Sequence, residues 1–175
     1  MRCNSGVSIR IVEISFMASA LLQGCASFDG RGLVPGKSVA ADVESLMGTP
    51  AERITAANGD RIWYYPRQPV GLHTFAVRIS PDGVMREIDQ RLTVQNLAKL
   101  VAGTTTAKEV RELLGPPWRT SHNFLKDHDV WDYRMYNAVQ VEHNLSVQFS
   151  ADGLVREVIL LRDYRNEPGG RKGGK

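Results

Sequence analysis

Hydrophobic positions along the chain change their spacing from helical to alternating. Between residues 39 and 47, Val43, Leu46 and Met47 stand at positions i, i+3 and i+4, which places them on one face of a helix. Apolar and polar residues then alternate in three short runs, at 61–65, 74–79 and 84–88. Such alternation is typical of strands with one buried face. The pattern predicts a helix followed by a three-stranded antiparallel meander.

The same order returns further along the chain. Gly36 corresponds to Gly103 and Ser80 to Ser150, an offset of about 67 to 70 residues. A second helix precedes Gly115, and three more alternating runs follow at 130–136, 144–149 and 154–161. The segment 92–101 predicts one further short helix between the two copies. An internal duplication of this kind is first a statement about architecture.

Residues with special backbone or capping preferences mark the ends of these elements. Thr106 and Glu109 have the spacing of a capping box, and Ser38 is the expected cap of the first helix. Asp-Gly pairs predict hairpin turns, because glycine adopts positive φ without steric cost. The structural turns are expected at Gly48, Gly83, Gly115 and Gly153.

The N-terminal segment has the pattern of an export signal. Arg2 and Arg10 precede an apolar run over 14–22, which is too short for a stable membrane span. The run ends in Leu-Gln-Gly-Cys25, which resembles the bacterial lipobox, whose cysteine is acylated. The alternative is an ordinary signal peptide with an incidental cysteine. Cys3 and Cys25 are the only cysteines, so the remaining chain has no disulfide and no cysteine-based metal site.

Composition excludes several classes of partner. Lys and Arg number 22 and Asp and Glu 19, giving a formal charge of +3, and the charges are interspersed. Nucleic-acid binding requires a clustered basic face, so we expect no nucleic-acid partner. No phosphate-cradling loop, Ser-His-Asp set or paired-carboxylate arrangement is present, so we expect no catalytic residues, no cofactor and no metal.

The shared motifs resemble those of a known family. Gly-x-Thr/Ser, Val-x-x-Leu-x-Gly-x-Pro, Trp-x-Tyr and a strand closed by Asp-Gly are similar to the SmpA/OmlA (BamE-like) outer-membrane lipoproteins. That resemblance implies two helices on a three-stranded antiparallel sheet, and the β-lactamase-inhibitory proteins look like a tandem of this unit. The second copy matches the whole unit, whereas the first lacks the leading helix.

We therefore predict an α+β protein of two tandem units, each with one or two short helices on a three-stranded sheet. Units of this size are marginal alone, so the halves are expected to pack together. The predicted organisation is a lipoprotein signal peptide (1–25), a tether (26–35), a first BamE-like repeat (36–91), a second (92–165) and a disordered basic tail (166–175).

Aromatic residues are the candidate partner-binding positions. Trp63 and Trp131 recur in both copies, and they are either core residues under a helix or part of a concave binding surface. Tyr64 and Tyr136, on the opposite faces of their strands, are the better candidates for contact. The cluster of His122, Lys126, Asp127, His128 and Asp129 is interpreted as a solvated loop rather than a metal site.

The resemblance implies an envelope lipoprotein anchored to the outer membrane through Cys25 and facing the periplasm. Its expected role is a non-catalytic binding or assembly scaffold, with an outer-membrane β-barrel or its assembly machinery as partner. The alternative is a module that recognises or inhibits a periplasmic enzyme. A hydrolase is a third and remote reading.

Overall fold

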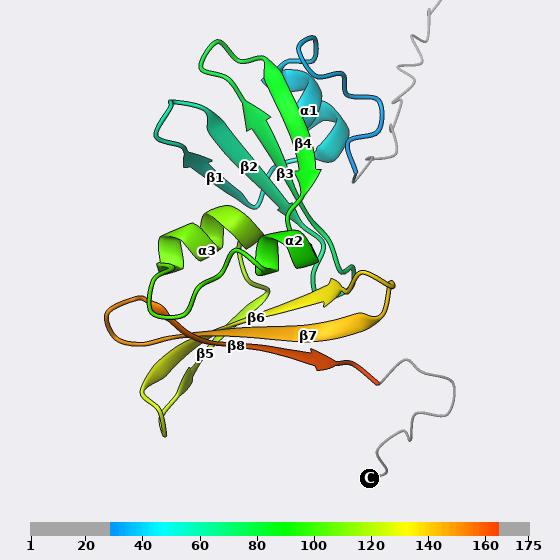
Figure 1. Ribbon diagram of the computed structural model, residues 1–175. Coiled ribbons are helices and arrows are strands. Elements are labelled where there is room, and N and C mark those ends of the chain that lie inside the picture. Colours follow the sequence, from blue (N-terminus) through cyan, green and yellow to red (C-terminus); the bar gives the residue numbers. More distant parts are fainter. Residues whose placement is uncertain (1–28, 165–175) are drawn as a thin grey trace, which may run out of the picture.

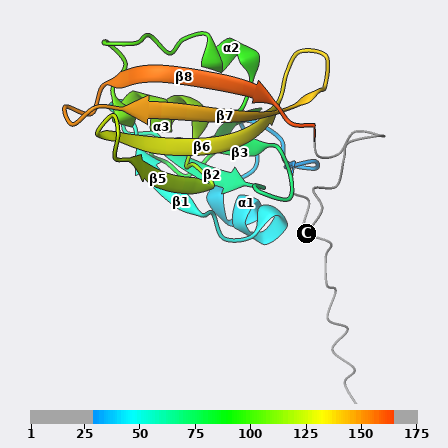
Figure 2. The ribbon, with the colours of Figure 1, turned by 90° about the horizontal axis from the view of Figure 1, so that it is seen from below.

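The computed structural model describes residues 29–164 (Figures 1 and 2). Its helices are α1 (Ala40–Met47), α2 (Val94–Leu97) and α3 (Ala107–Leu114). Its strands are β1 (Glu52–Thr55), β2 (Arg61–Pro66), β3 (Thr74–Ile79), β4 (Met85–Gln90), β5 (Arg119–Asn123), β6 (His128–Tyr136), β7 (Glu142–Phe149) and β8 (Val155–Arg162). The predicted signal peptide, Cys25 and the predicted tail lie outside the described residues.

Two antiparallel sheets of four strands each contain all the strands. Their orders are β1-β2-β3-β4 and β5-β6-β7-β8, so the same meander occurs twice. We call residues 29–91 the first unit and 92–164 the second. The α+β class is confirmed, but the predicted three-stranded sheets are wrong by one strand in each unit.

The missed strands are the two edges that precede the Trp-containing strands. β1 has only four residues, and β5 reads Arg-Thr-Ser-His-Asn. Neither buries a side chain fully, because each has a sheet neighbour on one side only and little packing above it. Hydrophobic alternation reports burial, so it gives no signal for strands that are held mainly by backbone pairing.

Each unit has its own hydrophobic core between an eight-residue helix and one face of its sheet. In the first unit, Val43 and Met47 of α1 pack with Trp63, Val77 and other residues of the sheet. In the second unit one face of α3 is buried in the same way: the core comprises Leu92, Val110, Leu114, Tyr133, Met135, Leu145, Val147, Phe149 and Val155.

The helix ends differ in how they are capped. Thr106 accepts a hydrogen bond from Glu109 N–H at 3.2 Å, and Glu109 accepts one from Thr106 N–H at 2.8 Å, so the predicted capping box is confirmed. In the first helix the expectation for Ser38 is wrong. Val39 is the N-cap residue, and its N–H donates to Asp42. Ser38 Oγ instead accepts from Val34 N–H, because Ser38 lies one residue too early to cap.

The two units stack so that the helices of the second lie between the sheets. Figure 1 shows α1 against the first sheet, with α2 and α3 between that sheet and the second. A small second apolar cluster, Ile62, Tyr64 and Ala76, covers the face of the first sheet opposite α1. Tyr64 reaches α3 and donates a hydrogen bond to Glu112 O at 3.2 Å. The first sheet is therefore covered on both faces.

The two units approach each other tightly around Gly115, where there is no room for a side chain. Gly48 and Gly115 end α1 and α3 with nearly the same backbone, φ 82°, ψ −168° and φ 79°, ψ −171°. A Cβ at Gly115 would lie 2.8 Å from Thr74 Cγ2 and 3.0 Å from Tyr64 Cδ1, whereas at Gly48 it would meet nothing within 4 Å.

Gly48→Ala and Gly115→Ala are therefore a matched pair. Both place a side chain at strongly positive φ, which costs about 1–3 kcal/mol. Gly115→Ala also pushes the units apart, and this should add about 1–3 kcal/mol. Urea unfolding of both variants measures the difference. Equal destabilisation would contradict the tight joint.

Candidate functional site: the joint between the units and its cleft

The tryptophans that were candidate binding residues pack mainly in the cores. Trp63 is 5% exposed in the first core, with the guanidinium of Arg53 4.9 Å from the centre of its ring. Trp131 is partly buried against the second core, with Phe149 at 4.7 Å between ring centres. Of the two readings of these residues, their positions favour the core.

The candidate tyrosines contact the other unit of the same chain. Tyr64 is fully buried, and its hydroxyl reaches α3. Tyr136 is partly buried at the end of β6, and its ring centre lies 5.6 Å from that of His73, which precedes β3. Tyr64 is therefore not available to an external partner in this structure, and Tyr136 is available only in part.

A bidentate ion pair joins the units at the start of β1. Arg111 Nε and Nη2 of α3 donate to the carboxylate of Glu52 at 2.7 Å each. The Arg111 side chain is 36% exposed and that of Glu52 22%, so water screens the pair only in part. The hydrogen bond to Glu52 is the main reason that the pKa of Arg111 is raised. The guanidinium also lies 5.5 Å from the centre of the Trp131 ring.

A second set of contacts joins the units at the loop between β2 and β3. The N–H of Arg134 donates to Gln68 Oε1 at 2.5 Å, and its Nη1 donates to Pro69 O at 2.6 Å. Arg134 also pairs with Glu142 and with buried Asp163. The loop between β2 and β3 is thus held by a strand of the second unit. Together with the ion pair of Arg111 and Glu52, these contacts fix the orientation of the units.

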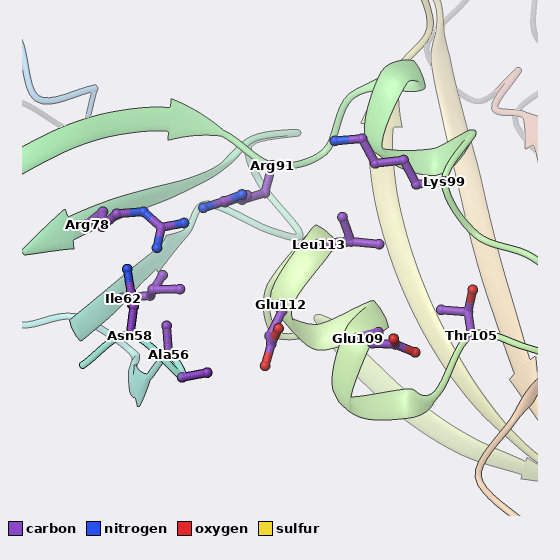
Figure 3. A pocket seen from close by; sticks show the side chains of 11 residues that line it. Ala56, Asn58, Ile62, Arg78, Arg91, Lys99, Thr105, Glu109, Glu112 and Leu113 are labelled. Carbon is purple, nitrogen blue, oxygen red and sulfur yellow. The ribbon is translucent and has the colours of Figure 1, made fainter. Parts of the chain in front are cut away.

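The joint also opens into a cleft of about 580 Å³. Ile62 of β2 and Leu113 of α3 supply apolar surface. Figure 3 shows Arg78 and Arg91 pointing toward one another, with Lys99 extending toward Arg91, while Glu109 and Glu112 lie on α3. The cleft therefore combines apolar surface with charges of both signs.

The two arginines of the cleft already have acidic partners. Arg78 lies 3.0 Å from Glu87 and 3.6 Å from Asp60, and Arg91 lies 3.0 Å from Asp89. Burial raises the pKa of Asp89, against the opposing effect of the Arg91 charge. Paired charges beside apolar surface can receive polar and apolar groups of a polypeptide. They do not form a nucleophile with its base.

The histidine-containing segment forms the β5–β6 hairpin. His122 lies 2.9 Å from Asp129 and 3.3 Å from Asp127, and the hydrogen bond to Asp129 is the main cause of its raised pKa. His128 is partly buried at the start of β6, and Lys126 pairs with Glu157 at 2.7 Å. Across residues 29–164, no group of three His, Cys, Asp or Glu residues could hold a metal ion.

Sequence reasoning missed the cleft and the apolar tip of this hairpin. Phe124 is 89% exposed and Leu125 99%. The charged cleft residues come from both copies, so only the stacking of the units brings them together. A signal for the tip was present, because the matching hairpin of the first copy reads Ala-Ala-Asn-Gly over 56–59.

The comparison with known proteins bears on the second unit. A family described as the outer membrane protein assembly factor BamE domain matches residues 90–158, from the end of β4 into β8. Residues 90–158 are BamE-like. The resemblance to the SmpA/OmlA group is confirmed over this part of the chain.

Other comparisons add little. No curated protein sequence matches the chain. A solved structure, that of a DUF4309 family protein (YjgB) from Bacillus subtilis, is 22% identical and covers 76% of this chain and 84% of its own, with a TM-score of 0.28. None of the helices within residues 29–164 is long and apolar enough to cross a membrane.

The ion pair between Arg111 and Glu52 should couple the units energetically. A double-mutant cycle with Arg111→Met and Glu52→Gln is expected to give a coupling of about 1 kcal/mol in urea melts, decreasing at high salt. The matched control is the exposed pair Arg156–Asp152 within one hairpin. That pair should give a few tenths of a kcal/mol at most. Equal couplings would argue against a structural role of the joint pair.

The buried tyrosines should make stability depend on alkaline pH. Burial raises the pKa of Tyr64 to about 12, and that of Tyr65 to about 12. The folded state therefore holds protons that the unfolded state loses near pH 10. The contribution of the protonated tyrosines to the free energy of unfolding is fully present below pH 10. It decreases as pH rises from 10 through about 12, by up to about 1.4 kcal/mol per pH unit per tyrosine.

Tyr64→Phe and Tyr65→Phe separate the alkaline pH dependence of stability from the stability that the hydrogen bond between the units contributes. Each should remove one tyrosine's share of the alkaline slope, measured by unfolding at pH 9–12. Only Tyr64→Phe loses the hydrogen bond to Glu112, so it alone should cost about 1 kcal/mol at pH 7. A wild-type stability that stays flat from pH 9 to 12 would contradict the raised pKa values.

Proposed function

We propose that this protein is a non-catalytic envelope lipoprotein that acts as a protein-binding scaffold in outer-membrane assembly. The observation that carries the proposal is the BamE-domain match over residues 90–158. That family is described as an outer membrane protein assembly factor. In this chain the matched second unit follows a first unit of the same topology.

Features of the joint support a binding role. The contacts of Arg111 and Arg134 hold the two units in one orientation, so the cleft between them has a defined shape. Its mixture of apolar surface and paired charges suits a polypeptide segment. The partner is expected to be an outer-membrane β-barrel protein or a subunit of its assembly machinery.

The location follows from the N-terminal sequence. The lipobox-like Leu-Gln-Gly-Cys25 supports a lipid anchor, and the residue after the cysteine is Ala26 rather than the Asp that usually retains lipoproteins in the inner membrane. We therefore place the protein at the outer membrane, with both units in the periplasm. The alternative, a module that inhibits a periplasmic enzyme, predicts a different set of partners.

Cys25→Ser tests the anchor and the partner together. The variant should take up no radiolabelled palmitate and should leave the outer-membrane fraction. After mild detergent extraction of the wild type, mass spectrometry should find barrel-assembly subunits enriched. Cys3→Ser is the matched control, since Cys3 precedes the apolar run, and it should behave as the wild type.

Two results would overturn the proposal. Palmitate incorporation into the Cys25→Ser variant would show that the anchor lies elsewhere. Stoichiometric recovery of a soluble enzyme, with no assembly subunit, would favour the inhibitor alternative.

A further inference from the structure

The two sheets have four edges, and three of them are protected against pairing with another chain. The edge strands are β1, β4, β5 and β8. β1 has four residues, β5 is polar throughout, and β4 carries Arg86, Glu87 and Asp89. Short length and charge are the usual means by which proteins protect an edge.

The fourth edge lacks this protection. β8 has eight residues, and Val-Ile-Leu-Leu occupies 158–161 without a charge or a proline. Val158 and Leu160 are each 36% exposed, and Leu161 is 62% exposed. An exposed apolar edge strand is a template for strand pairing, so its persistence needs a reason.

Comparison of the two copies shows that the fold does not require this sequence. β4 and β8 begin alike, with Arg86-Glu87 and Arg156-Glu157, and both sheets shift register at this point. The copies then diverge to Asp89-Gln90 in β4 and Ile159-Leu160 in β8. The same position in the same meander is polar in one unit and apolar in the other.

The backbone of β8 has hydrogen-bonding groups on its outer side. Asp163 N–H donates to Glu142 O at 2.9 Å on the β7 side. Successive residues of a strand point their backbone groups to opposite edges. Residues in step with Asp163, including Ile159, therefore point toward β7, and Val158 and Leu160 point outward. No strand within residues 29–164 pairs with that outer side.

The cover of the outer side ends where β8 begins. Val155 N–H donates to Thr105 O at 2.8 Å, and Val155 O accepts from Gly103 N–H at 2.7 Å. The loop before α3 thus covers the first residue of the strand. Beyond the register shift near Phe149, the regular ladder with β7 leaves the outer groups of the apolar segment for a further strand.

We propose that the β8 edge binds an extended strand of another polypeptide by strand addition. A peptide backbone matches a series of outward N–H and C=O groups, and the apolar side chains beside them select a strand with apolar residues. Strands of outer-membrane barrels alternate apolar and polar residues over about ten positions. The occupant is therefore a barrel-type strand before its barrel closes, and this source rests on the proposed function.

Amide hydrogen exchange tests the proposal directly. The probe is a synthetic ten-residue peptide of alternating Val and Thr with lysine at its ends, added to the ¹⁵N-labelled full chain in mild detergent. Exchange of the Val158 and Leu160 amides should slow at least about tenfold. The Ile159 and Leu161 amides, which already face β7, should change little.

Peptide and protein variants separate strand addition from apolar adhesion. A peptide N-methylated at every residue keeps its side chains but cannot pair, and it should not bind. In the protein, Leu160→Pro removes an outward N–H and should weaken binding at least about tenfold, whereas Leu160→Thr keeps the N–H and should stay within about threefold. Protection of the β7 amides shows that each variant is folded.

Two outcomes would overturn the proposal, and a third would separate it from the proposed function. Binding of the fully methylated peptide would indicate apolar adhesion. Slow exchange of the Val158 and Leu160 amides without peptide would show that the edge is already covered. If that protection depends on protein concentration, a second copy covers the edge; if it does not, another segment of this chain does. Alternating protection with the peptide, together with no assembly subunit in the co-purification, would keep strand addition and remove only the proposed function.

Discussion

The structure depends on one helix that serves two sheets. Val110 and Leu114 of α3 enter the core of the second unit, while Arg111 and Glu112 of the same helix contact the first. An eight-residue helix would be unstable by itself, since tertiary packing supplies most helical stability. Contacts on both sides therefore stabilise α3 and also cover the second face of the first sheet. The Gly115 backbone, which admits no side chain toward Tyr64, allows the two sheets to approach it this closely.

Local patterns in the sequence predicted the elements that bury a periodic face. The helix around Val110 and the strand around Val147 were found because the core selects their apolar positions. β5 was missed, because five polar residues carry no such signal. The cap of α1 was misplaced by one residue, which is within the usual uncertainty of helix boundaries. These errors fall where tertiary packing leaves no periodic trace in the side chains.

The joint could not be predicted from either copy alone, but the difference between the copies contained a signal for it. Tyr64 in the first copy corresponds to Asp132 in the second, when Trp63 is matched with Trp131. Their neighbours across the sheet are Ala76 and Ser146, respectively. An apolar pair in one copy and a polar pair in the other indicate that only the first sheet has a covered second face. From its strand alone, Tyr64 was a candidate for contact with an external partner. Compared between copies, it indicates an interface within the chain.

The same comparison shows how the two units divide their roles. In the first unit, α3 covers the sheet face opposite α1, and the edge strand β4 is charged. The second unit, where the family match lies, has the apolar hairpin tip at Leu125 and the apolar edge of β8. Each of these exposed features is absent at the matching place in the first unit, so none is needed to form the fold. Residues that the fold does not need, and that expose apolar surface at a cost in solubility, are best explained by recognition of a partner. If the protein binds a partner as proposed, the second unit therefore offers most of the surface for it, and the first unit fixes α3 and closes the cleft.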